Sequence, residues 1–377
     1  MLEYLLVVVV GAGTTYLLAA VARELALRVG AVAKVRDRDV HAIPIPYFGG
    51  VAMMGGLVAS YVVARHLPFL GRSDDQVFAD ARAVLIGGLV ICAVGVVDDL
   101  YELDAVTKLA GEVLAAGVVV VQGMQLYWIP LPGASTSTTF VLDGSQAALL
   151  TVLVIVTTVN AVNFIDGLDG LAAGVIGIGA AAFFSFAYLL AAENHITVTT
   201  TPALLTAALC GVCFGFLPHN VFPARMFMGD SGALLIGFML SASSITLTGQ
   251  FDPGTISEGM AGTTASLLPT FLPLVLPIAV LVLPFVDLLL AVVRRTRAGL
   301  SPFSPDKQHL HHRLLDIGHS HRRAVLVLYL WAALVSGGVV VIGLFAGWRS
   351  IVAVSTVLVF ALLATFRLPS RVRDLVR

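Results

Sequence analysis

Long apolar runs, separated by short polar segments, dominate the chain. A helix that crosses a lipid bilayer needs about 20 predominantly apolar residues. Eleven runs come near that length, at residues 3–28, 47–65, 82–97, 106–122, 146–163, 170–191, 202–217, 231–248, 266–293, 324–345 and 350–366. The third and seventh runs are short, so we expect their helices to be tilted or to extend into the flanking polar residues.

The composition agrees with a membrane protein. Of the 377 residues, 58% are hydrophobic and only 12% are charged, whereas soluble domains carry about 25% charged residues. These values exclude an ordinary soluble domain and a disordered chain. A formal net charge of -1 leaves no basic surface, so we expect no nucleic-acid partner. The predicted fold class is all-α: a polytopic integral membrane protein with a single transmembrane domain over residues 1–377.

The distribution of basic residues predicts the orientation, because Lys and Arg are concentrated in cytoplasmic loops. With eleven spans, few of the 22 Lys and Arg residues fall on the outer side, namely Arg65, Arg72, Arg82 and Arg349. We therefore expect the N-terminus outside and the C-terminus in the cytoplasm, with the chain in the inner (plasma) membrane of a cell.

One outer segment has a pattern of its own. Residues 123–145 are rich in Pro, Ser and Thr, and we predict a small hairpin there. We find no repeat between the two halves of the chain.

Polar and charged groups gather in the inner loops. Charges near hydrocarbon are costly and mark functional sites by default. Although these loops are far apart in sequence, the alternation of helix direction brings them to one membrane surface. We predict that they form one site facing the cytoplasm, built from residues 30–46, 98–106, 160–170, 218–231 and 294–323.

Asp98 and Asp99 are adjacent carboxylates at the end of the third run. Two such groups repel each other unless a cation or a hydrogen-bond donor compensates. Magnesium would do so, since it prefers carboxylate oxygens together with substrate phosphates. The alternative is an acidic pair that ends a helix and is simply solvated.

The segment NAVNFIDGLDG (160–170) repeats polar residues in three-residue steps. Asn160, Asn163, Asp166 and Asp169 would share one side of a helix. Gly167 lets the backbone approach a ligand closely. The alternative is a plain Asn/Asp/Gly turn between two helices.

Three further positions could act on phosphate or on a base. In FMGDSG, Asp230 is either a metal ligand or the N-cap of the next helix. Phe227 is either a stacking platform for a nucleobase or a core residue. Lys108 either neutralises a pyrophosphate or extends to the membrane interface.

The segment HLHHR follows the ninth run. Its spacing does not match a structural zinc site, and no Cys lies near it. A cationic clamp on phosphate fits better, with anchoring to anionic lipid as the alternative. The residues concerned are His309, His311, His312 and Arg313.

Together, acids that hold a divalent cation and bases that hold phosphate suit Mg²⁺-dependent diphosphate chemistry at the boundary of water and lipid. The motifs VVDDL, NAVNFIDGLDGLAAG, PARMFMGDSG and DKQHLHHRLLDIGHSHRRAVLVLY occur in this order. As a set they resemble the polyprenyl-phosphate N-acetylhexosamine-1-phosphate transferase family, over residues 34–330.

The resemblance implies a reaction. A UDP-sugar and polyprenyl phosphate (undecaprenyl or decaprenyl) would give polyprenyl-diphosphate-sugar and UMP, with Mg²⁺ as cofactor and Mn²⁺ able to substitute. The spaced H-L-H-H is similar to the GlcNAc-1-phosphate branch, so UDP-GlcNAc is the expected donor for the first lipid-linked step of a cell-envelope polysaccharide. The MurNAc-pentapeptide enzymes, which more often show contiguous His residues, are the alternative.

The resemblance also assigns the reacting groups. Asp98 would contact or deprotonate the lipid phosphate, with Asp99 beside it, and both belong with Asp166 to the expected catalytic set. Asp230 and Asn163 would hold Mg²⁺.

The substrate-binding residues come from the same resemblance. Phe227 would stack on uracil, with Asp169 and the backbone of Gly167 and Leu168 nearby, and Asp166 would support the nucleotide-sugar site. The remaining expected substrate-binding residues are Lys108, Asn160, His309, His311, His312 and Arg313.

A secondary transporter is the competing class. Its carboxylates would lie near the bilayer midplane between repeated halves, whereas here the acids fall at one face and no repeat is found. Small residues in membrane helices could support a homodimer, but Gly and Ala are too widespread in this chain to locate an interface.

Overall fold

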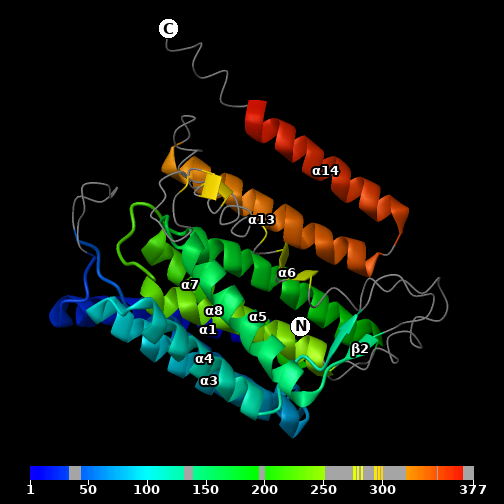
Figure 1. Cartoon of the computed structure of the whole chain (residues 1–377), viewed down its shortest axis with the longest axis horizontal. Coiled ribbons are helices and arrows are strands. Elements are labelled where there is room, and N and C mark those ends of the chain that lie inside the picture. Colours follow the sequence, from blue (N-terminus) through cyan, green and yellow to red (C-terminus); the bar gives the residue numbers. More distant parts are fainter. Residues whose placement is uncertain are drawn as a thin grey trace.

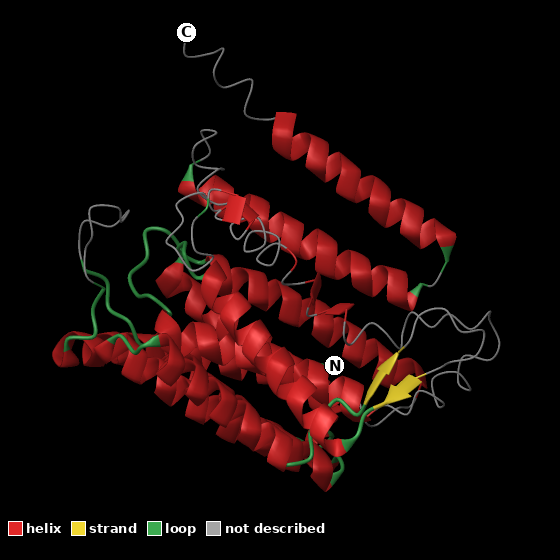
Figure 2. Cartoon of the chain, in the orientation of Figure 1, coloured by secondary structure: helices red, strands yellow, loops and turns green. Residues whose placement is uncertain are grey.

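The computed structural model describes residues 1–33, 44–130, 139–194, 200–250, 320–345 and 347–367, with positions 275, 276, 278, 279, 282, 293, 294, 296, 297 and 299 between them. Within these residues the chain is almost entirely helical (Figures 1 and 2). The helices are α1 (Leu2–Val29), α2 (Gly49–His66), α3 (Asp75–Tyr101), α4 (Ala105–Val121), α5 (Gly144–Ile165), α6 (Leu171–Asn194), α7 (Thr200–Asn220), α8 (Gly229–Gln250), α13 (His321–Leu344) and α14 (Trp348–Arg367).

The predicted apolar runs correspond closely to these helices. The third and seventh runs extend at both ends, as α3 and α7, so this prediction is confirmed. The run at 266–293 lies largely outside the described residues. Among the described helices, seven are long and apolar enough to cross a membrane: α1, α3, α5, α6, α7, α8 and α13. The helical, multi-pass architecture is therefore confirmed, and the count of eleven spans stays a prediction.

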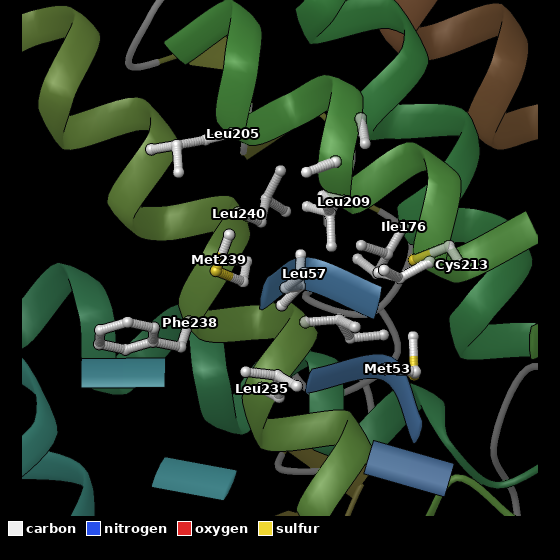
Figure 3. Packing of buried hydrophobic residues seen from close by; sticks show 14 of the residues in the cluster. Met53, Leu57, Ile176, Leu205, Leu209, Cys213, Leu235, Phe238, Met239 and Leu240 are labelled. Atoms are coloured by element: carbon white, nitrogen blue, oxygen red, sulfur yellow. The ribbon is translucent and has the colours of Figure 1, made fainter. Parts of the chain in front are cut away.

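Helix α8 lies at the centre of the bundle. It packs against α2, α3, α5, α6 and α7 and is buried along nearly its whole length. Its side chains interdigitate with Met53 and Leu57 of α2 and with Leu205 and Leu209 of α7 (Figure 3). The hydroxyls of Ser241, Ser243, Thr246 and Thr248 donate to carbonyls of the preceding turn, so these four buried hydroxyls are satisfied within the helix.

Two glycines bring neighbouring backbones against the start of α8. A Cβ added to Gly50 of α2 would lie 2.2 Å from the carbonyl carbon of Ser231, and one added to Gly95 of α3 would lie 2.4 Å from Ser231 Cα. Small residues permit such close approach in membrane helix bundles. The ends of three helices therefore meet around Ser231, which is 0% exposed.

The remaining helices surround this centre. Helix α1 packs on α2 and α7, α13 packs on α6, and α14 lies outside α13 (Figure 1). Strands β1 (Trp128–Pro130) and β2 (Thr139–Val141) pair antiparallel between α4 and α5, with Trp128 opposite Val141. The hairpin predicted within residues 123–145 is thus confirmed.

Candidate active site

The predicted polar groups meet at one end of the bundle. The end of α3, the start of α4, the end of α5 and the start of α8 converge there, and Lys108 is at the centre. Lys108 Nζ lies 2.9 Å from Asp98 Oδ2 and also pairs with Asp230. The Lys108 and Asp98 side chains are only 16% and 10% exposed. Lys108 therefore does not extend to the membrane interface, and Asp98 is not a solvated residue at the end of a helix.

Asn163 completes the contact between α5 and α8. With its amide oriented to satisfy both atoms, the nitrogen donates to Asp230 Oδ1 at 2.9 Å and the oxygen accepts from Lys108 Nζ at 3.1 Å. Asp230 and Asn163, the two residues that the resemblance assigns to the cation, are therefore in contact.

Asp99 accepts hydrogen bonds from the backbone at the start of α8. Its Oδ1 accepts from the Asp230 backbone N–H at 2.8 Å and its Oδ2 from that of Ser231 at 3.3 Å. Gly229 precedes them with φ 69°, and a Cβ there would lie 2.5 Å from Asp99 Oδ2. A carboxylate at this position satisfies free N–H groups and complements the positive end of the helix dipole. Asp99, and not Asp230, therefore caps α8, and the Asp230 carboxylate faces Lys108 and Asn163.

The short turn between α3 and α4 sets the position of Lys108. Asp98 Oδ1 accepts from the Leu103 N–H at 2.6 Å, which folds the chain back after α3. Asp104 then caps α4 by accepting from the backbone N–H groups of Val106 and Thr107, each at 3.0 Å. One turn later, Lys108 is directed back towards Asp98.

Asp166 follows α5 and lies among other carboxylates. Its loss of solvation and the neighbouring charges of Asp230, Asp99 and Asp169 raise the pKa of Asp166 to about 8. The carboxylates of Asp230, Asp99 and Asp169 therefore lie close enough to Asp166 for their charges to disfavour its ionised form.

Asp169 and its neighbours brace the loop between α7 and α8. Asp169 Oδ2 accepts from the Ala224 N–H at 2.9 Å. Asn220 accepts from the Gly170 N–H at 2.9 Å, and Tyr329 of α13 donates to the Gly170 carbonyl. Asn220 and Tyr329 were not predicted as site residues, although Asn220 is a polar residue at the end of an apolar run and Tyr329 is the last residue of the motif DKQHLHHRLLDIGHSHRRAVLVLY.

Phe227 lies at the edge of this loop and is partly exposed. Its backbone N–H donates to Pro46 at 2.9 Å, and its carbonyl accepts from Gly49 at 3.2 Å. The end of the first inner loop therefore lies beside the site. The Phe227 ring is 6.1 Å from that of Tyr47, centroid to centroid, so a pair of aromatic rings lies next to the segment that leads into α8.

Asn160 lies one turn deeper along α5. Its Nδ2 donates to Glu112 Oε2 at 2.6 Å and to the Val156 carbonyl at 2.9 Å. Glu112 was missed, because a single acid within an apolar run resembles an ordinary helix position. In the 166–170 turn, Gly167 is exposed and Leu168 is buried. The His309, His311, His312 and Arg313 clamp lies outside the described residues, as does most of the inner loop 294–323.

The donor set fits Mg²⁺. Within the described part of the chain, no three His, Cys, Asp or Glu side chains form an all-protein metal cage. Mg²⁺ does not require one, since it is usually held by one or two carboxylates together with substrate phosphates and water. Asp230, Asn163 and Asp98 offer oxygen atoms of this kind.

The fold and the site thus define a multi-pass membrane protein in which carboxylates, an amide and a lysine from four helices meet at one end of the bundle. Residues 81–248, which hold the Asp98, Lys108, Asn163 and Asp230 cluster, match glycosyl transferase family 4. The chain is 45% identical over 340 residues to decaprenyl-phosphate N-acetylglucosaminephosphotransferase of Mycobacterium tuberculosis (strain ATCC 25618 / H37Rv), covering 89% of this chain and 81% of the relative.

Two further relatives are named for the same kind of transferase. The protein of the same name from Mycolicibacterium smegmatis (strain ATCC 700084 / mc(2)155) is 43% identical over 366 residues, covering 96% of this chain and 88% of the relative. A probable undecaprenyl-phosphate N-acetylglucosaminyl 1-phosphate transferase of Bacillus subtilis (strain 168) is 30% identical over 362 residues, covering 96% and 90%. The chain belongs to glycosyl transferase family 4 and is a membrane-embedded transferase, and the resemblance inferred from its motifs is confirmed.

Proposed function

We propose that the protein transfers GlcNAc-1-phosphate from UDP-GlcNAc to a polyprenyl phosphate, giving polyprenyl-diphosphate-GlcNAc and UMP. The observation that carries this proposal is the cluster in which Lys108 joins Asp98 of α3 to Asp230 of α8, with Asn163 of α5 beside them. The names of the mycobacterial relatives support GlcNAc-1-phosphate as the transferred group and decaprenyl phosphate as the acceptor.

The reaction forms one P–O bond and breaks another. An oxygen of the lipid phosphate attacks the β-phosphorus of the donor, and the oxygen that bridges the two phosphates leaves with UMP. The acceptor phosphate is already ionised near neutral pH, so Asp98 orients it and does not need to act as a strong base.

The chain's own groups supply the rest. Asp230 and Asn163 would hold Mg²⁺, which when bound neutralises charge on the diphosphate. Lys108 exchanges its carboxylate partners for substrate phosphate oxygens. Phe227 offers a partly exposed ring on which the uracil stacks, and the His309–Arg313 segment contributes cationic contacts to the diphosphate or the sugar.

We further propose that the site faces the cytoplasm of the inner membrane, in a chain of eleven spans with its N-terminus outside. The lopsided distribution of Lys and Arg supports this orientation. So does the chemistry, because the donor is soluble and the acceptor is embedded in the membrane. The product would begin the assembly of a cell-envelope polysaccharide.

A donor comparison tests the function. The purified chain, in lipid nanodiscs with decaprenyl phosphate and Mg²⁺, should release UMP from UDP-GlcNAc, and the lipid product should carry the sugar. UDP-GalNAc and UDP-MurNAc-pentapeptide serve as competing donors. Release from UDP-MurNAc-pentapeptide alone would move the protein to the alternative branch, and absence of UMP with every donor would refute the proposal.

A further inference from the structure

Helix α4 carries a second charged residue one turn beyond Lys108. Glu112 is 1% exposed, and its Oε2 accepts from Asn160 Nδ2 at 2.6 Å. A buried carboxylate in an apolar helix is costly unless a good donor satisfies it. The partner is on another helix, so this hydrogen bond ties α4 to α5.

The same two helices make a matching contact nearer the pocket. Lys108 and Glu112 are four residues apart on α4, while Asn160 and Asn163 are three residues apart on α5, so each pair shares one face of its helix. Lys108 meets Asn163, and Glu112 meets Asn160. Two such bonds, one turn apart, fix both the rotation and the height of α5 relative to α4.

Asn160 is also held within its own helix. Its Nδ2 donates to the Val156 carbonyl at 2.9 Å as well as to Glu112. The Glu112 contact links two helices that both carry site residues.

We propose that Glu112 is a positioning residue: through its hydrogen bond to Asn160 it sets α5 so that Asn163 stands beside Asp230 at the cation site. This inference rests on the proposed function. In it, Asn160 positions α5 and does not contact the substrate directly. Removing a residue that hydrogen-bonds directly to a metal ligand typically weakens metal binding by about 10–100-fold. Glu112 acts one step further away, through the helix that carries Asn163, so we expect an effect near the lower end of that range.

The experiment compares Glu112→Leu, Glu112→Gln, Asn160→Leu and the double Leu variant. Mn²⁺ affinity of the purified full chain, measured by electron paramagnetic resonance without nucleotide, should fall about tenfold or more in both single Leu variants. Glu112→Gln should stay within about threefold of the wild type, because the Gln oxygen accepts the same hydrogen bond. The Mg²⁺ concentration for half-maximal UMP release should follow the same order.

The double variant separates linkage from general damage. It removes both partners and leaves no buried polar group unsatisfied, so it remains folded, and its Mn²⁺ affinity should be no weaker than that of the worse single variant. The matched control is Thr151→Val, which removes a buried hydroxyl that links α5 to the Leu126 N–H away from the site. It should lower the melting temperature and leave Mn²⁺ affinity unchanged.

Several results would overturn the inference: wild-type affinity in folded Glu112→Leu, a Glu112→Gln variant as weak as Glu112→Leu, additive losses in the double variant, or a wild type that binds no Mn²⁺. A wild type that binds Mn²⁺ but releases no UMP would instead refute the proposed function, because the affinity measurements need no turnover.

Discussion

Removing the Asp99 carboxylate should loosen the start of α8 and thereby misplace Asp230. Asp99 accepts two backbone N–H groups there, at 2.8 and 3.3 Å. Loss of an N-cap costs about 0.5–2 kcal/mol, and loss of a negative charge at a helix N-terminus costs about 0.3–1 kcal/mol. For Asp99→Ala the two effects together destabilise the fold by about 1–3 kcal/mol.

The assay pairs melting temperature with Mg²⁺-dependent UMP release. Asp99→Ala should lower both. Asp99→Asn keeps one acceptor oxygen for the shorter bond to the Asp230 N–H, so it should recover part of the stability. Asp98→Asn is the control at the neighbouring residue: it should lose activity with a smaller fall in melting temperature, because its remaining oxygen can still accept from the Leu103 N–H and Lys108 keeps Asp230 as a partner. If Asp99→Ala melts at the wild-type temperature, or Asp98→Asn is the less stable variant, the capping argument is wrong.

Three further changes have defined outcomes. Asp230→Asn should reduce cation-dependent UMP release by at least about 100-fold while the chain stays folded, since it removes the charged oxygen proposed for Mg²⁺; UMP release and melting temperature are measured. Phe227→Ala should raise the KM for UDP-GlcNAc by about fivefold or more, with kcat little changed, because stacking on a base contributes about 1–3 kcal/mol. Gly95→Ala should destabilise the fold by about 1–3 kcal/mol, as its Cβ would meet the Ser231 backbone; thermal unfolding measures the effect.

Each change has a control. Phe227→Tyr keeps the ring and should retain the wild-type KM, and an unchanged KM in Phe227→Ala would make the ring a packing residue only. Gly117→Ala adds a methyl group to α4 where nothing lies within 4 Å, and because Ala favours a helix over Gly it should not lower the melting temperature. Cation-dependent turnover in Asp230→Asn would remove that residue from the cation site.

The sequence predicted the helices and their meeting point, because both follow from simple periodic features. Apolar runs of bilayer length mark the helices, and alternating helix direction brings Asp98, Lys108, Asn163 and Asp230 to one end. The different roles of Asp98 and Asp99 could not be predicted from the sequence. Successive helix residues point about 100° apart, so adjacent acids face different neighbours, and those neighbours are known only once the helices pack.

The partner of Glu112 could be predicted even less from the sequence. A lone acid in an apolar run predicts some partner but not which one, since the partner depends on how α4 rotates against α5. Asn160 was expected to bind substrate, which stays a prediction; the hydrogen bonds from its amide nitrogen to Glu112 and Val156 could not be predicted from the motif that it shares with Asn163. Similarly, Tyr329 braces Gly170 from a helix that lies far away in sequence.

The contact of Gly50 and Gly95 with Ser231 has a mechanical consequence. No layer of side chains separates these backbones, so α2, α3 and α8 cannot slide past one another by changing rotamers. The segments that carry Asp98, Asp99 and Asp230 are therefore held rigidly together, and any adjustment to an incoming lipid or nucleotide has to come from α4 and α5, which carry Lys108 and Asn163. An inhibitor that binds to the paired ends of α3 and α8 would meet preformed groups and would bind without the entropic cost of ordering them.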